Sequence, residues 1–545
     1  MTDAKERVKA WLMELALLVE VGEDPSERCY AYFSQEPALG MMLVDILASL
    51  EDKNTDEERT FYSACIFSLD VCVSQLQSAF ENGNKGSGKT LTQLMTHLAV
   101  ALSTSGHDLT FWLPILNAFY EVHVDLTSEL KQAYLALVHE DETTLPEDDI
   151  AHLNSIRDLI HELSDLSVFD IAENFFAQSY AMPADFFIDL MMDLFSMEEG
   201  QDIGLLALLH PRADVRDVVV DTLDELLPRV VLSSSSLSRL QVIKNWYPDD
   251  LKGALNRWLK EQRKKGVVFQ QDNPARMIRI QATEVDGGGA QGLFIHIKRG
   301  REHRLCGLLF KVGLGIKDAW LTAPMGSAEV ARYYDDVFQE TVMLREVDMA
   351  YLMTMTQHFL ATTLQQGAMP DLHLLEIQEE LGVHFVPEPL DVSFIMEQLA
   401  VEIIPFTGDV VEASLKRTRS WPKNKRFTES WYVENAQIDK IVNRCCSFVD
   451  GVKVCRFDEA MADVFEHEME TKRSHWAFHF LWIALWLKAK KRKNEKMWQD
   501  GFLIAHVIHE GRPLHEIPIM QAICRQSVIN SIETMHERRT HLTQE

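Results

Sequence analysis

The helical character of this chain is clearest in the segment GLLALLHPRADVRDVVVDTLDELL, residues 204–227. Its first apolar run is short and ends at His210-Pro211, a pair that predicts a turn because proline cannot continue a helix. Asp214 has the side chain of a good N-cap for a second helix. Apolar residues of that second helix recur at helical spacing and are expected to face the first helix: Val215, Val218, Val219, Leu223 and Leu226. The segment therefore predicts two short helices joined by a proline-containing turn.

This helix pair resembles a HEAT-like repeat unit, with the proline in the turn and Asp214-Val215-Arg216 opening the second helix. The resemblance covers residues 204–227, which is one unit. It implies stacked antiparallel helix pairs that form a curved array whose concave face binds other macromolecules. The alternative is an irregular all-helical domain, because no second copy with the same signature is present.

After Lys265 the pattern changes from helical spacing to strand alternation. Residues 277–283 and 293–299 alternate, and Asp286-Gly-Gly-Gly289 between them predicts a turn that needs positive φ angles. Strand character continues through 304–312 to 319–321. We therefore predict a small antiparallel meander, which needs helices packed on one face to be stable.

These changes of pattern predict a mainly α protein with a small antiparallel β-meander insert and three domains. Residues 1–265 form an acidic all-helical array with HEAT-like, α-α superhelical character, and residues 266–325 form the meander. Residues 326–545 form a C-terminal helical domain with basic, Trp-rich and His-rich segments, interrupted by a loop-rich stretch at about 404–435. A chain of this length is expected to divide in this way.

Net charge is distributed very unevenly along the chain. Residues 1–245 carry 42 acidic and 15 basic side chains, whereas residues 246–545 carry 41 and 38. The density is greatest in residues 101–200, with 20 acidic and 2 basic side chains. Such an imbalance selects partners at long range. We therefore expect a protein partner with a basic surface, or attraction to the chain's own basic clusters, within one molecule or between two self-associating copies.

The cysteines are scattered and include no C-x-x-C pair. This indicates a reduced, cytoplasmic setting in which free thiols are buried. A zinc site from Cys445, Cys446, Cys455 and His467 is an alternative that the spacing does not favour.

The first 22 residues predict an amphipathic helix rather than a secretory leader, and the most apolar stretch, 476–487, is too short to span a bilayer. We expect no membrane partner.

A basic and aromatic segment is the candidate contact site for nucleic acid or an acidic partner. Its cations would bind phosphates while aromatic faces stack on bases. The candidate residues are Lys416, Arg417, Arg419, Trp421, Lys423, Lys425, Arg426 and Phe427. Smaller basic clusters occur at 257–265, 298–304 and 488–496. Solvated helix faces, or pairing with the acidic half, are the alternatives to a binding role.

Two further patterns were weighed as cofactor sites. Residues 83–90, GNKGSGKT, match the P-loop pattern, but no buried strand precedes them, so we predict a flexible loop between two helices and no cofactor. The pairs His475/His479 and His506/His509 could bind a transition metal between two helices, although helical faces that combine histidine with tryptophan are usually core. We therefore assign no metal residues.

No complete catalytic constellation is present in the sequence, which favours a protein that is not an enzyme. The leading function is a protein-interaction scaffold or adaptor that uses the acidic helical-repeat surface. A nucleic-acid-associated protein using residues 416–432 is the alternative. A second alternative is a metal-dependent enzyme using the C-terminal histidines.

Overall fold

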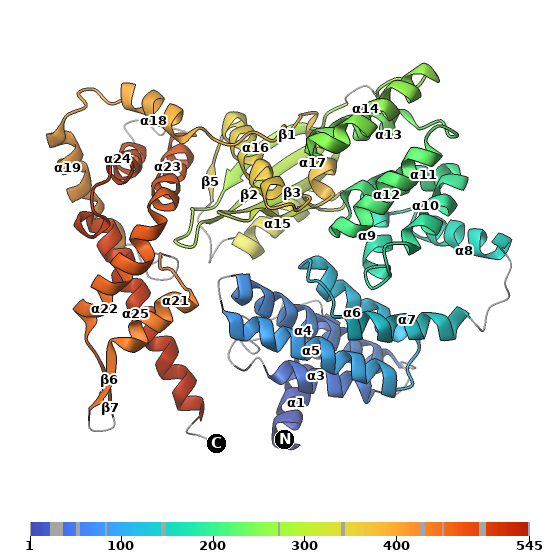
Figure 1. The fold of residues 1–545 in the computed structure, drawn as a ribbon, viewed down its shortest axis with the longest axis horizontal. Helices are drawn as coiled ribbons and strands as arrows, with labels where there is room; N and C mark the ends of the chain where they lie inside the picture. The colour runs from blue at the N-terminus through green and yellow to red at the C-terminus, as the bar shows by residue number, and fades with distance from the viewer. Residues whose placement is uncertain are drawn as a thin grey trace. The chain divides into compact units, whose positions relative to one another are not determined.

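The computed structural model describes residues 2–21, 36, 38–50, 55–81, 84–142, 149–270, 273–338, 344–423, 431–449, 452–489 and 497–542. The chain forms two compact units. The N-terminal unit comprises residues 1–207 with 217–222, and the C-terminal unit comprises residues 208–216 with 223–545. Helices dominate both units, and a small antiparallel sheet lies in the second (Figure 1). The predicted fold class, mainly α with a small meander, is confirmed.

Amphipathic helices build the N-terminal unit. In the first helix, Val8, Leu12 and Leu15 recur at helical spacing and are buried, as the sequence predicts. A capping box starts a later helix, because the Ser167 hydroxyl accepts from the Asp170 N–H while the Asp170 carboxylate accepts from the Ser167 N–H. The helices are α1 (Thr2–Val21), α3 (Leu39–Ala48), α4 (Asp56–Glu81), α5 (Lys85–Thr104), α6 (Leu109–Glu121), α7 (Ser128–Glu142), α8 (Asp149–Glu162), α9 (Val168–Gln178), α10 (Phe186–Ser196) and α11 (Glu198–Leu206).

The segment that resembles a HEAT-like unit has the predicted order of elements but a different cap. A 3-10 turn, η1 (Ala207–Leu209), follows α11, and α12 (Ala213–Leu226) begins after the His210-Pro211 turn. Arg212, not Asp214, is the N-cap residue, because the chain is still extended there. Asp214 lies inside the first turn, where its carboxylate suits the helix dipole and pairs with Arg212 at 2.6 Å. The order of helices does not by itself establish a HEAT repeat.

The apolar positions predicted for α12 are partly confirmed as core. Val215, Val219 and Leu223 are fully buried, whereas Val218 and Leu226 are half-buried. Two more helices follow α12 before the sheet, and the second ends where the sequence changes character. They are α13 (Ser234–Trp246) and α14 (Asp249–Lys264).

The meander forms as predicted and gains one short strand. Strands β1 (Arg276–Ala282), β2 (Ala290–Arg299), β3 (Glu302–Lys311) and β4 (Gly315–Leu321) pair antiparallel in sequence order. Gly289 and Gly300 take positive φ angles of 74° and 62° in the two tight turns. Strand β5 (Arg345–Glu346) adds to β1, which gives the order β4-β3-β2-β1-β5.

Helices cover one face of this sheet, as a sheet of this size requires (Figure 1). Alternate residues of β2 from Gln291 to Ile297 are buried on that face. The Phe310 ring stacks on Phe359 with centroids 4.9 Å apart. The covering helices are α16 (Met349–Gln365) and α17 (His373–Leu381), whereas α15 (Ser327–Phe338) packs on β3.

The C-terminal helical region, residues 392–542, surrounds one central helix. From residue 476 to residue 487 that helix is mostly apolar because nearly all of it is core: Trp476, Phe480, Leu481, Trp482 and Ala484 are buried. The elements are α18 (Val392–Val401), α19 (Gly408–Thr418), η2 (Trp421–Lys423), α21 (Ala436–Arg444), β6 (Cys446–Val449), β7 (Val452–Cys455), α22 (Phe457–Val464), η3 (Phe465–Met469), η4 (Glu470–Lys472), the central α23 (Arg473–Ala489), α24 (Met497–His509), η5 (Leu514–Glu516) and α25 (Pro518–Leu542).

The structure bears on two expectations: a loop-rich stretch at 404–435 and the lack of a membrane-spanning helix. The stretch at 404–435 was expected to be rich in loops, but α19 occupies residues 408–418 because Thr407 caps its first turn. Among the described residues, none of the helices combines the length and apolar character that a membrane crossing requires.

A buried hydrogen-bonded triad joins the sheet to α16 and α23, and we predict that it is important for stability. Tyr351 donates to Gln291 Oε1 at 2.6 Å, and Trp482 Nε1 donates to the Tyr351 hydroxyl at 2.9 Å. Tyr351→Phe should lower the free energy of unfolding by about 1–2 kcal/mol, because buried polar groups lose a partner. Urea unfolding followed by tryptophan fluorescence measures this. Tyr432→Phe is the control, since its half-buried hydroxyl has no partner among the described residues, and equal losses would contradict the prediction.

Candidate functional site

The predicted basic segment lies at the end of α19 and in η2, and the structure divides its residues into two groups. Lys416, Arg419 and Lys423 are exposed, and Trp421 is half-buried. Arg417 differs from them because it pairs with a buried carboxylate. Three of the predicted contact residues lie outside the described residues: Lys425, Arg426 and Phe427.

Arg417 makes an internal ion pair rather than offering a free cation. Its Nη2 lies 2.5 Å from Oδ1 of Asp500, a carboxylate buried on α24. The Ser414 hydroxyl donates to the same oxygen at 2.6 Å. A buried carboxylate needs such donors because burial without them is costly. Arg417 therefore joins α19 to α24, while its side chain remains 47% exposed.

Beside this ion pair, α19 and α24 enclose a groove of about 520 Å³. Gly511, just after α24, takes a φ of 91°, which lets the chain turn after the helix ends. The walls combine apolar and charged side chains. The lining residues are Gly408, Val411, Glu412, His506, Val507, Glu510, Gly511 and Arg512.

The positive charge in the groove is already neutralised. Arg512 bonds to Glu412 across the groove and lies 3.6 Å from Glu516. Burial lowers the pKa of His506, against the smaller opposing effect of Glu510, so its imidazole is neutral at pH 7. The His506 ring contacts Phe406 edge to face, with centroids 5.1 Å apart. The groove therefore offers apolar contacts and a surplus of carboxylates.

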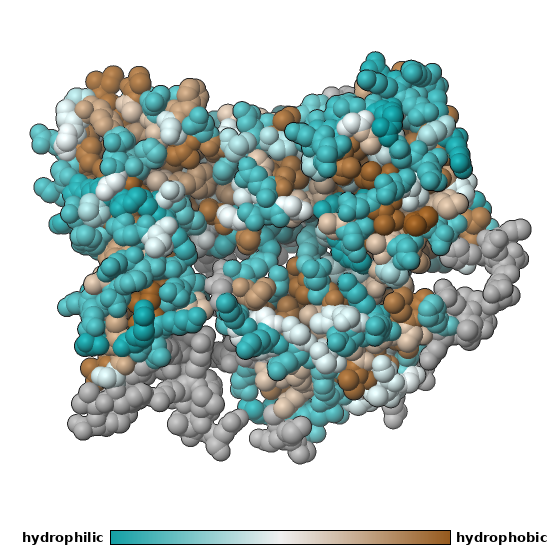
Figure 2. Space-filling model, viewed as in Figure 1, coloured by the Kyte–Doolittle hydropathy of each residue, from teal (hydrophilic) through white to brown (hydrophobic). Residues whose placement is uncertain are grey.

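Large apolar side chains are exposed next to the groove. Ile404 is 87% exposed, Val401 76% and Phe394 54%, and Phe406 continues the apolar surface to the groove. Figure 2 shows apolar surface gathered over this end of the C-terminal helical region, near α18. We call these four residues and the groove the α18–α19 surface. Clustered exposed apolar side chains of this kind mark interaction sites.

The segment that carries most of this surface, residues 391–414, has charges of one sign. Residues 391–414 contain no Lys or Arg and five acids: Asp391, Glu397, Glu402, Asp409 and Glu412. Two of the five are neutralised from outside the segment, Glu402 by Lys488 and Glu412 by Arg512. The α18–α19 surface is therefore both apolar and acidic.

Sequence analysis did not identify this surface. Its apolar residues Val401, Ile404 and Phe406 have the composition of core residues, and only the structure shows that they are exposed. A signal was nevertheless present, because Pro405 and Gly408 interrupt the apolar run in a stretch without a single cation.

The described histidines of the C-terminal helical region do not come together as a metal site. The His475 and His479 rings are near-parallel with centroids 6.4 Å apart, and His479 is fully buried with a pKa lowered to about 3, chiefly by burial. His506 lines the groove, whereas His509 is exposed. Within the described part of this region, no three His, Cys, Asp or Glu side chains gather closely enough to hold an ion. The metal-dependent alternative gains no support.

The P-loop-like residues are helical, so the predicted flexible loop is wrong from Lys85 onward. Asn84 caps α5 by accepting from Gly86 N at 3.0 Å and Ser87 N at 3.3 Å, which places Lys89 inside the helix. The preceding element is the helix α4 and not a strand. The phosphate-binding context is therefore missing, as the sequence indicated.

The prediction that the cysteines are free buried thiols is wrong for one pair. Cys446 and Cys455 form a disulfide between β6 and β7, which also removes them from any zinc site. Cys445 and the other described free cysteines are buried, as expected: Cys65, Cys72, Cys306 and Cys524.

The charge asymmetry follows the division into compact units. Residues 1–207 carry 37 acidic and 10 basic side chains, so this segment has 27 more acidic than basic side chains. The basic clusters of the C-terminal unit instead pair with acids of that same unit, such as Arg257 with Asp224 at 2.7 Å and Arg304 with Glu376 at 3.1 Å. Arg257 and Arg304 are therefore engaged within the C-terminal unit.

Comparisons with known proteins find two matching regions. A family model described as the Y4lR C-terminal helical domain matches residues 393–532, and one described as the Y4lR second domain matches residues 183–266. The uncharacterized protein y4lR of Sinorhizobium fredii is 27% identical over 327 residues, 59% of this chain and 60% of the relative. The chain thus matches less than two thirds of that relative's length.

No solved structure matches this chain. The similarity to Y4lR proteins takes the place of the HEAT-like resemblance as the better-supported relationship, because it covers 327 residues rather than one helix pair. The whole α18–α19 surface and the basic segment lie within the residues matched by the C-terminal domain model.

We predict that Arg417 acts in stability and Lys416 does not. Arg417→Ala should cost about 1–2 kcal/mol, because Asp500 stays buried with Ser414 as its remaining donor and the pair is only partly screened. Lys416→Ala should change stability by less than about 0.5 kcal/mol. Thermal or urea unfolding compares the two variants. Equal effects would return Arg417 to the residues available for ligand binding.

Proposed function

We propose that this chain is a cytoplasmic protein-interaction scaffold whose α18–α19 surface binds a basic, apolar protein segment. The observation that carries the proposal is the strong exposure of Val401 and Ile404 beside an open groove, in a segment without cations. Apolar surface supplies binding energy of about 25 cal/mol per Å² removed from water. The surrounding carboxylates select the charge of the partner.

The same carboxylates argue against other macromolecules at this surface. Nucleic acid and anionic membranes are both negatively charged, and both would meet Glu397, Asp409 and Glu510, whereas the described cations beside them, Lys488 and Arg512, are already paired with carboxylates. A protein segment with apolar residues flanked by Lys or Arg satisfies both the apolar and the acidic features. A groove of about 520 Å³ suits a few side chains of such a segment.

The acidic N-terminal unit supports a scaffold with more than one contact site. Helix α10 exposes Phe186, Ile188 and Met192, and Asp185 and Asp189 beside them are exposed too, which is the same combination of apolar and acidic side chains. We infer that this unit is the predicted acidic helical array, with HEAT-like character at 204–227, and that its charge steers basic partners. Two such surfaces on two compact units are what a scaffold requires.

The proposal predicts that exposed apolar residues of the α18–α19 surface are needed for partner binding. Proteins captured from native cell extract by the wild-type chain should be identified by mass spectrometry, and the partner purified. Val401→Ser/Ile404→Ser should raise its Kd by ~30-fold, since about 2 kcal/mol of apolar contact is lost. Folding should be unaffected, because both side chains are exposed.

Val268→Ser is the matched control, since Val268 is 69% exposed but lies outside this surface. Glu397→Lys/Asp409→Lys tests the charge requirement and should weaken binding at low salt more than at high salt. A partner that binds all variants equally, or no partner with a basic segment, would refute the proposal.

Nucleic-acid binding remains a second candidate because of one specific observation. Lys416, Arg419 and Lys423 are exposed around Trp421, whose ring contacts Trp431 edge to face with centroids 6.2 Å apart. Cations beside an aromatic ring are the combination that single-stranded nucleic acids require.

This second candidate makes its own prediction. A fluorescent 20-nucleotide single-stranded RNA should bind with micromolar affinity at low salt, and Lys416→Glu/Arg419→Glu should abolish binding, because like charges would face the phosphates. Fluorescence anisotropy measures the affinity. Glu57→Lys, which changes an exposed position of α4 in the N-terminal unit, is the control. Absence of wild-type binding would eliminate the nucleic-acid function.

A further inference from the structure

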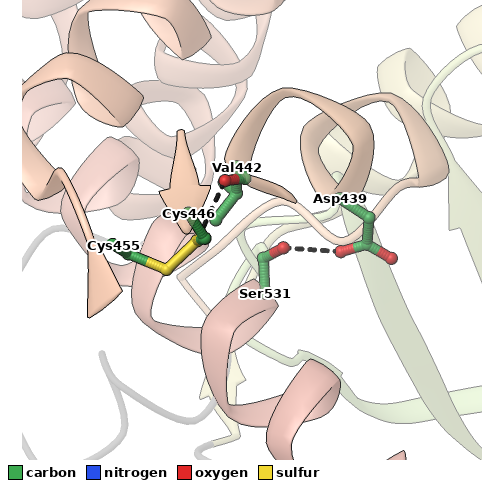
Figure 3. Close-up of a disulfide and its surroundings, with 5 residues drawn as sticks. All are labelled: Asp439, Val442, Cys446, Cys455 and Ser531. Carbon is green, nitrogen blue, oxygen red and sulfur yellow. Dashed lines mark hydrogen bonds between the residues drawn. A yellow bond between two sulfur atoms is a disulfide. The ribbon is translucent and has the colours of Figure 1, made fainter. Parts of the chain in front are cut away.

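The disulfide joins residues that lie directly opposite each other in a small ribbon. Cys446 in β6 pairs in register with Cys455 in β7, and both are half-buried (Figure 3). The other described cysteines are all buried free thiols. Within the described part of the chain, this pair therefore contains the cysteines that are not fully buried.

Packed helices flank the ribbon on both sides in sequence, but the ribbon itself is not part of a larger sheet. It contains β6 and β7 alone, and an isolated two-stranded ribbon is only marginally stable in water. Its flanking helices α21 and α22 pack on α25. The Ser531 hydroxyl of α25 donates to Asp439 of α21 at 2.7 Å (Figure 3), and Ile441 is fully buried. The disulfide thus stabilises the ribbon, whereas packing holds the helices.

The two sulfur atoms have different electrostatic surroundings. Cys446 follows the C-terminus of α21, and its Sγ lies 3.1 Å from the Val442 carbonyl oxygen (Figure 3). Cys455 precedes the N-terminus of α22, next to Arg456, which pairs with Glu459. Carbonyl groups disfavour a thiolate, whereas the N–H groups of a helix N-terminus favour one. Cys455 is therefore the better leaving group.

We propose that Cys446–Cys455 is a reversible redox site that reacts with dithiol reductants. One thiolate of the dithiol attacks Cys446 Sγ, forms a mixed disulfide and releases Cys455 as a thiolate, which takes up a proton. The second thiol of the reductant then attacks the mixed disulfide and releases Cys446, whose thiol can donate to the Val442 carbonyl. The reductant leaves as its own disulfide, so two electrons and two protons pass to this chain.

Reduction changes the ribbon and leaves its supporting helices in place. Without the covalent link, β6 and β7 separate more often, because they have no third strand. The cytoplasmic location that forms part of the proposed function makes this exchange relevant, since disulfides in a reducing compartment are usually transient or redox-sensing. The chemistry itself does not depend on that location.

The first experiment tests accessibility in the folded, full-length chain. Protein purified without reductant is blocked with N-ethylmaleimide, treated with dithiothreitol under native conditions, and labelled with iodoacetamide. Peptide mapping should find the second label on Cys446 and Cys455 and not on the buried Cys445. N-ethylmaleimide on both cysteines before reduction, or a need for denaturant to label them, would overturn the proposal.

The second experiment tests direction and locality. Brief exposure to the monothiol glutathione, followed by acid quenching, should trap the adduct on Cys446, and an adduct chiefly on Cys455 would overturn the assigned direction. After reduction, amide hydrogen exchange in 446–455 should rise by ~10-fold or more while 438–444 stays protected. Exchange that rises in both segments would contradict a local opening. Cys445→Ser is the control, and should leave labelling and exchange as in the wild type.

Discussion

The helix α23, which is buried along most of its length, is the constraint on which the C-terminal unit depends. A helix with apolar residues on all sides must be covered on all sides, and here α16, α18 and α24 pack on it while the meander reaches it at Gln291. Trp482 illustrates the arrangement, because its indole N–H is satisfied only by reaching Tyr351 at 2.9 Å and Gln291 at 3.2 Å. The sheet and the C-terminal helices are therefore parts of one core, although sequence patterns separate them.

This packing also positions the candidate interaction surface. Once α24 is fixed against α23, its buried Asp500 requires donors, which Arg417 and Ser414 of α19 supply. The same two helices then form the groove that contains Val411 and Val507. The need of the buried Asp500 carboxylate for donors thus fixes α19 against α24 and so determines the shape of the groove. The exposed apolar residues beyond the groove are not needed for this packing, which is why they point to a partner.

The sequence predicted the secondary-structure elements better than the tertiary contacts between them. Period and turn signals found the meander, its glycine turn and the burial of Val215 and Val219, because these depend on neighbouring residues. The Asp214 cap was wrong by two positions, since the start of a helix is set by where the chain leaves its extended conformation. The pairing of Arg417 with Asp500 depends on tertiary packing, which spacing along the sequence does not contain. The exposure of Ile404 could not be predicted from the sequence either, because an apolar residue type does not show whether the side chain lies on the surface or in the core.

The redox site and the interaction surface are connected by α25 but are expected to act independently. This helix packs on α19 at one end of the C-terminal helical region and on α21 and α22 at the other. Coupling would require an element with two arrangements that both sites influence. The Asp439–Ser531 hydrogen bond and buried Ile441 hold α21 on α25 whether or not the sulfur atoms are bonded. Since the ribbon alone loses its constraint, reduction changes the surface of the ribbon and leaves the shape of the groove unchanged.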